Sequence, residues 1–225
     1  MMSEPFGDLA QSCAPMIAVE TLAGIVSLES GFSPFYIRTN SGLPLKTQPV
    51  SKSEAVQTAT ELAAQHQDIQ LGLSGLRIEN LEKLNMSVSD AFEPCLNLKA
   101  TATLLKSYYR FALRLGDDEA QAHTSMLQSF YGEGDPSLGA VVKYDSQVKH
   151  EIDRLKPIMT ELVVSAPLHG DDQMHSTAVP GLASDIAAEN SIQPEAIKAG
   201  SPSWDVFNRQ WQSSILVFQN KNGAN

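Results

Sequence analysis

The chain has 225 residues, of which 42% are hydrophobic and 19% charged, and its formal net charge is −10. This composition is typical of a globular protein with room for one domain and an appendage. Because a phosphate backbone demands clustered Lys and Arg, the acidic balance argues against a nucleic-acid partner and against nonspecific binding to an anionic membrane surface. No apolar run approaches the ~20 residues that a spanning helix needs.

The first predicted helix, residues 15–29, carries an acid at its end. Leu22, Ile25 and Glu29 follow one another at helical spacing on an apolar face, and Gly31 is a helix stop. Burial and the partial negative charge of a helix C-terminus both favour the protonated carboxyl, and a neutral carboxyl near pH 7 can act as a general acid. The alternative is that Glu29 turns outward and pairs with a Lys or Arg.

Further along the chain, apolar stripes at helical spacing alternate with Gly- and Pro-containing turns. Few runs have the alternation of a strand, so the pattern predicts a mainly α fold. The expected elements are a long loop or short-stranded segment at 32–49, a helix capped by Ser51 to about residue 65, a short helix at 78–84, a long helix at 95–115 ended by Gly116, a helix capped by Asp117, and a last helix at about 138–155.

After residue 155 the character changes, because prolines recur between Ser, Ala and Asp residues. We therefore expect a helical domain at 1–155, a largely disordered linker at 156–202 and an aromatic interaction segment at 203–225. Trp204, Phe207 and Trp211 have the spacing of a helix that docks into a groove, whereas residues 215–218 could instead add a strand to a partner. The third alternative is that this tail folds back onto the helical domain.

A series of short motifs runs through the first hundred residues. They are CAP at 13–15, ESGF-P at 29–34, N-G at 40–42, QPVS-EA at 48–55, GL at 72–73, NL at 80–81 and DAF-PC-NL at 90–98. In this order and spacing they resemble the lytic transglycosylases of bacterial type IV secretion systems, which are lysozyme-like enzymes that cleave peptidoglycan. The resemblance covers roughly residues 6–150.

The resemblance implies a lysozyme-like helical domain with a glycan-strand cleft. The implied site consists of the catalytic acid Glu29 and the substrate-binding residues Ser30, Asn40, Gly72, Leu73 and Tyr131. For three of these a structural role is the alternative: a helix cap for Ser30, a turn for Asn40 and a core aromatic for Tyr131. One departure concerns the groove, because Gly75 stands where the family usually has Gln.

The implied reaction uses one acid. Glu29 protonates the oxygen between N-acetylmuramic acid and N-acetylglucosamine, the substrate's acetamido group stabilises the anomeric carbon, and a 1,6-anhydro ring closes. Glycosidases typically use two carboxylates, but Glu20, Glu54, Asp68 and Asp90 all lie in cap, turn or wrong-face contexts. No metal and no cofactor is expected.

The two cysteines, Cys13 and Cys95, lie inside motifs that carry the resemblance. We predict that they form a disulfide closing a loop of ~80 residues. Free thiols in the core are the alternative.

The resemblance also implies a place of action. We expect a periplasmic enzyme that opens the cell wall locally for secretion or conjugation, although residues 1–8 lack the basic start of an export signal. The expected partners are peptidoglycan glycan strands and, through the tail, secretion-system assembly proteins. The alternative is a noncatalytic adaptor that keeps the fold and binds glycan.

Overall fold

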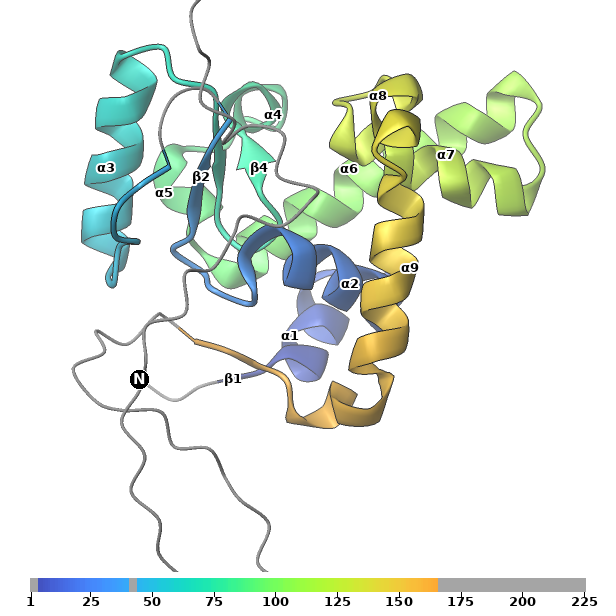
Figure 1. Ribbon diagram of the computed structural model, residues 1–225, viewed down its shortest axis with the longest axis horizontal. Helices are drawn as coiled ribbons and strands as arrows, with labels where there is room; N and C mark the ends of the chain where they lie inside the picture. Colours follow the sequence, from blue (N-terminus) through green and yellow to red (C-terminus); the bar gives the residue numbers. More distant parts are fainter. Residues whose placement is uncertain (1–3, 41–43, 166–225) are drawn as a thin grey trace, which may run out of the picture. The chain divides into compact units, whose positions relative to one another are not determined.

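The computed structural model describes residues 4–40 and 44–165 (Figure 1). Helices make up most of this part of the chain, so the predicted mainly α fold is confirmed. In chain order they are α1 (Phe6–Cys13), α2 (Val19–Ser30), α3 (Lys52–Ala64), α4 (Ile78–Lys83), α5 (Val88–Ala91), α6 (Pro94–Leu115), α7 (Glu119–Tyr131), α8 (Pro136–Val141), α9 (Tyr144–Leu155) and the 3-10 helix η1 (Lys156–Glu161). None of these helices is both long and apolar enough to cross a membrane.

Several boundaries follow from local chemistry. The Ser51 side chain accepts a hydrogen bond from the Glu54 N–H and so begins α3 as expected, while Gly116 ends α6 in the left-handed conformation. The predicted cap of α7 is wrong by one residue, because Asp118 rather than Asp117 accepts the bond from the Gln121 N–H.

The structure corrects two predictions: the single helix at about 138–155, and the end of the helical domain at residue 155. The single helix expected at about 138–155 is two helices, α8 and α9, because Lys143 between them has a left-handed φ of 55°. The helical domain also continues past residue 155, since η1 leads into β5 (Val163–Val164), which pairs antiparallel with β1 (Glu4–Pro5). Residues 156–164 therefore belong to this domain and not to the linker. The rest of the linker and the aromatic segment lie outside the described residues.

A small antiparallel sheet was not predicted beyond a short strand near 32–49. It has the order β2-β3-β4, formed by β2 (Ile37–Thr39), β3 (Ile69–Leu71) and β4 (Leu76–Arg77). The register places Arg38 opposite Gln70 and Gln70 opposite Arg77. Because paired residues of neighbouring strands point to the same face, these three polar side chains form one row across the sheet.

The core brings the end of α2 beside the start of α9, which run side by side (Figure 1). The two helices approach closely at Gly24, where an added Cβ would lie 2.9 Å from the Val148 carbonyl oxygen. From this contact Ser27 of α2 reaches Glu151 and Arg154 of α9, while Glu29, at the end of α2, meets Tyr144 at the first turn of α9. This packing places the Tyr144 side chain beside the Glu29 carboxyl.

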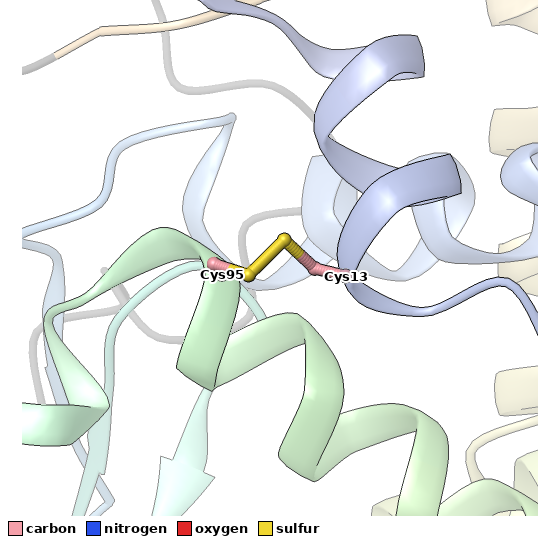
Figure 2. Close-up of a disulfide and its surroundings, with 2 residues drawn as sticks. All are labelled: Cys13 and Cys95. Carbon is pink, nitrogen blue, oxygen red and sulfur yellow. A yellow bond between two sulfur atoms is a disulfide. The ribbon is translucent and has the colours of Figure 1, made fainter.

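The predicted disulfide is confirmed. Figure 2 shows Cys13 at the end of α1 joined to Cys95 in the first turn of α6; their Cα atoms are 5.2 Å apart and their positions are 82 apart in sequence. The bridge ties the two ends of a long segment that includes α2 and the whole three-stranded sheet.

Candidate functional site

Glu29 is the buried acid that its helical spacing predicts. Leu22 and Ile25, the preceding members of its row, are fully buried, and Glu29 itself is 6% exposed. Gly31 ends the helix in the left-handed conformation, with φ 58°. The side chain therefore does not turn outward into solvent, although it does pair with an arginine.

Both oxygens of the Glu29 carboxyl accept a hydrogen bond. Tyr144, at the first position of α9, donates its hydroxyl to Oε1 at 2.6 Å, and Arg38 of β2 donates Nη1 to Oε2 at 2.8 Å. Two donors on two oxygens fix the plane of the carboxyl. Such short contacts are stronger when the carboxyl is ionised than when it carries its proton.

Opposing effects act on the acid's proton. Burial is the largest and raises the pKa of Glu29 above its ordinary value, because a low-dielectric surrounding disfavours the charged form. The charge of Arg38, the Tyr144 hydrogen bond and the more distant charge of Arg77 act in the opposite direction, and burial outweighs them. The pKa of Tyr144 is also raised, by burial and by the neighbouring Glu29, so its hydroxyl stays protonated and donates.

The sheet row lies next to this carboxyl. Arg38 Nη1 also reaches Gln70 Oε1 at 3.4 Å, and its Nη2 donates to the carbonyl oxygens of Leu28 and Glu29, both at 2.9 Å. The guanidinium thus satisfies carbonyls at the end of α2 that have no partner within the helix. One side chain therefore holds the acid, its helix end and the middle of the sheet.

Arg77, the third member of the row, holds two other carboxylates. Its Nη1 lies 3.2 Å from Asp68 Oδ2 and 2.7 Å from Glu133 Oε1. Glu133 follows the end of α7 and has a left-handed φ of 56°. The pair with Glu133 consequently joins the sheet to the connection between α7 and α8.

The turn between β3 and β4 rests on one buried amide. Asn97 of α6 accepts hydrogen bonds from the N–H and hydroxyl of Ser74, and donates to the carbonyls of Leu71 and Ala91. The side chain is fully buried. This network sets the backbone that carries Gly75 past the Glu29 carboxyl.

We expect Asn97→Ala to lower the free energy of unfolding by about 3 kcal/mol, because the Ser74 N–H and two carbonyls lose their partner in a buried place. Chemical denaturation with matched fits of the denaturant slope measures the change. Thr103→Ala is the control, since Thr103 is exposed on the same helix and its hydroxyl bonds only to the Lys99 carbonyl. A loss for Asn97→Ala as small as that of the control would contradict the expectation.

Three predicted site residues have other roles than expected. Ser30 donates to the Leu73 carbonyl at 2.7 Å, not to Glu29, and so ties the end of α2 to the turn. The Leu73 side chain is fully buried in the core, so it does not line a groove. Gly72 is required by close packing within the protein, because a Cβ there would lie 2.2 Å from the Ala91 carbonyl oxygen and 2.5 Å from Asn97 Nδ2.

Two predicted sugar contacts remain predictions. Tyr131 is half-buried, and its ring centroid lies 5.2 Å from that of Tyr144, one ring away from the acid. Asn40 is exposed and donates its backbone N–H and its Nδ2 to Asp68, which precedes β3.

Five residues around the site were not predicted from the sequence: Arg38, Gln70, Arg77, Tyr144 and Glu133. A weak signal existed for the sheet row, because each of its residues neighbours a buried apolar residue in a strand-like alternation. Tyr144 was expected only as part of an apolar stripe, yet a buried tyrosine hydroxyl usually needs a partner. No local pattern marks Glu133.

Two surface hollows lie away from Glu29. One of 440 Å³ is lined along α6 by Lys106, Arg110 and Arg114 among others, and one of 320 Å³ lies beside Leu84 and Leu96. In the part of the chain that the structure describes, no three His, Cys, Asp or Glu side chains form a cluster that could hold a metal ion. What the Glu29 site offers is acid–base chemistry.

Comparisons with known proteins agree with the motif resemblance. The chain is 43% identical over 128 residues to the type IV secretion system protein virB1 of Brucella suis biovar 1, a match covering 56% of this chain and 53% of that protein. It is 39% identical over the same length to virB1 of Brucella abortus. A longer match, 28% over 156 residues, covers 69% of this chain and 62% of virB1 of Agrobacterium fabrum.

The chain spans about half the length of the Brucella relatives it matches. No protein-family model matches the chain, and no solved structure matches it. The resemblance to type IV secretion proteins is nevertheless confirmed by these relatives.

Proposed function

From its homology with virB1 proteins of type IV secretion systems, we propose that this chain is a peptidoglycan lytic transglycosylase that opens the cell wall for such a system. The observation that carries the proposal is the buried Glu29 carboxyl at the end of α2, with its plane fixed by Tyr144 and Arg38 and its pKa raised by burial. This is the arrangement that a general acid working near neutral pH requires.

In the proposed reaction Glu29 gives its proton to the oxygen that links N-acetylmuramic acid to N-acetylglucosamine. The bond from that oxygen to the anomeric carbon breaks, and the substrate's own acetamido group stabilises the positive charge that develops there. Glu29, now a carboxylate, accepts the proton of the six-position hydroxyl as that oxygen bonds to the anomeric carbon. A 1,6-anhydro ring results, no water is consumed, and the acid is restored.

A single carboxyl is enough for this sequence of steps. Glycosidases that hydrolyse the bond commonly place a second carboxylate across the scissile bond. Here Asp68 and Glu133, the nearby candidates, are both engaged by Arg77. Their engagement supports a mechanism in which the substrate supplies the nucleophile.

The proposal is tested by identifying the products that the protein releases from purified cell-wall sacculi. We expect the full chain to release muropeptides that end in 1,6-anhydro-N-acetylmuramic acid, each one water lighter than the product of hydrolysis, as measured by mass spectrometry. Muropeptides with free reducing ends would instead point to a lysozyme-type hydrolase. An absence of any product would reject both enzymes.

The rate should depend on pH through Glu29. Since burial raises its pKa, the protonated acid persists to a higher pH than an ordinary Glu side chain allows. We therefore expect kcat/KM to fall as pH rises through this raised pKa, and the fall to be centred above 4.5, the ordinary Glu value. A profile whose alkaline fall is centred at or below the ordinary Glu value would contradict this.

The alternative is a noncatalytic adaptor that binds glycan in the periplasm and recruits assembly proteins. One fact favours it: both Glu29 oxygens are already engaged. Binding of sacculi without any product, unchanged in Glu29→Gln, would select the adaptor. In either case the assembly proteins and the tail segment 203–225 remain predictions.

A further inference from the structure

The Arg38 guanidinium makes four contacts that converge on the acid. Its Nη2 donates to the carbonyl oxygens of Leu28 and Glu29, and its Nη1 donates to Glu29 Oε2 and, at 3.4 Å, to Gln70 Oε1. The carboxylate is thus tied through one planar group to the last turn of its own helix. A lysine could not span these acceptors, because its single ammonium lacks the fixed fork of a guanidinium.

The Gly75 backbone packs closely beside the same oxygen. Gly75 has a left-handed φ of 65°, and a Cβ built on it would lie 3.0 Å from Glu29 Oε2 and 3.5 Å from Gln70 Oε1. Any side chain at position 75 would crowd the carboxyl. Glycine at this position therefore leaves Oε2 where Arg38 holds it.

The other polar groups near the carboxyl have partners of their own. Oε1 is covered by Tyr144, which is buried, and Arg77 faces Asp68 and Glu133. Gln70 turns its Oε1 toward Arg38 Nη1 and toward Gly75. Among the described residues, Arg38 is therefore the charged group in direct contact with Oε2.

We propose that Arg38 is a positioning residue, which fixes Oε2 of Glu29 against the last turn of α2 and beside the Gly75 backbone, so that the acid keeps one orientation during proton transfer. This inference rests on the proposed function and adds to it the residue that orients the acid. Arg38 can only donate, so Oε2 accepts from the guanidinium whether or not the carboxyl carries its proton.

The electrostatic role of Arg38 follows from the same contacts. Its charge opposes the effect of burial on the pKa of Glu29, as do Tyr144 and Arg77. Without Arg38 the acid would hold its proton more tightly and would give it up less readily. Arg38 thereby favours the step in which Glu29 gives up its proton.

Three full-length variants test the charge and the fork separately. Arg38→Met removes both, and Arg38→Lys keeps the charge without the fork. Arg154→Met is the matched control, because Arg154 donates to Ser27 on α2 at 2.9 Å and pairs with Glu151 but does not contact Glu29. Thermal melting of each variant identifies any loss of fold.

The readouts are the carbon-detected NMR titration of the Glu29 carboxyl, assigned by its absence in Glu29→Gln, and kcat and KM on sacculi. We expect Arg38→Met to raise the Glu29 midpoint and to lower kcat by about 10- to 100-fold, as misplacement of a catalytic group does. Arg38→Lys should lower kcat with a smaller change of midpoint. Arg154→Met should change neither.

Position 75 tests whether the placement of Oε2 matters. Gly75→Ala should lower kcat/KM because its methyl group would displace Oε2, whereas Gly116→Ala also puts alanine at a positive φ, of 102°, but has no atom within 4 Å of the added carbon. Equal loss in both alanine variants would assign the loss to the strained φ and would overturn this requirement on Oε2. An unchanged midpoint and kcat in Arg38→Met would overturn the positioning role.

The titration needs no substrate, so these outcomes are separable from the proposed function. A shifted midpoint in a protein that releases no product would reject the enzyme and keep the contact between Arg38 and the acid. Product release that is indifferent to Arg38 would keep the enzyme and reject this inference.

Discussion

Glu29→Gln should abolish the release of anhydromuropeptides from purified sacculi, with a loss of at least about 1000-fold, because an amide cannot give a proton to the leaving oxygen. The fold should survive. The amide oxygen can replace Oε2 as the acceptor for Arg38, and the amide nitrogen can donate to Tyr144 once its hydroxyl rotates. Muropeptide chromatography measures the loss, and circular dichroism checks the fold.

The same variant has a stability signature. The folded-state pKa of Glu29 is raised, so the wild-type protein has its full stability from this group below the ordinary Glu value of 4.5 and loses it as pH rises through the raised pKa. Glu29→Gln lacks this titration and should show a flatter dependence of stability on pH across that window. Product release equal to wild type would exclude Glu29 as the acid.

Cys13→Ala with Cys95→Ala should cost about 4.5 kcal/mol of stability, because the bridge closes a loop of 82 residues and removes its entropy from the unfolded chain. For a domain of this size we expect a melting temperature lower by about 10–15 °C. Differential scanning calorimetry of oxidised protein measures it. Reductant should lower the wild-type value similarly, since Cys95 is exposed.

Either single variant is the internal control, because losing one cysteine removes the whole bridge. Both should therefore fall near the double variant rather than halfway. A double variant that melts within about 2 °C of the oxidised wild type would contradict a stabilising bridge. Two reactive thiols in the denatured, unreduced protein would contradict the bridge itself.

How far the sequence could predict the site depends on the range of the interactions involved. Glu29 was predictable because a helical row and a glycine stop are read within a dozen residues. Its partners were not, because Tyr144 lies 115 residues away and Arg38 reaches the acid only through a strand. Gly72 and Leu73 were expected to line the groove, but Gly72 is required by close packing against the Ala91 backbone. The sequence cannot distinguish a glycine that lets a sugar approach from one that lets a neighbouring backbone approach.

The amino-acid sequence alone determined the buried acid at the end of α2, the capped start of α3, the extent of α6 and, through shared motifs, the pairing of Cys13 with Cys95. The first three features depend on local hydrogen bonds and on the period of apolar residues, whereas the pairing was expected from the motif resemblance. Tertiary structure alone decided that Arg38, Gln70 and Arg77 form one row and that this row meets Glu29. Strand register and helix packing create that meeting, and neither is written in any short stretch of the chain.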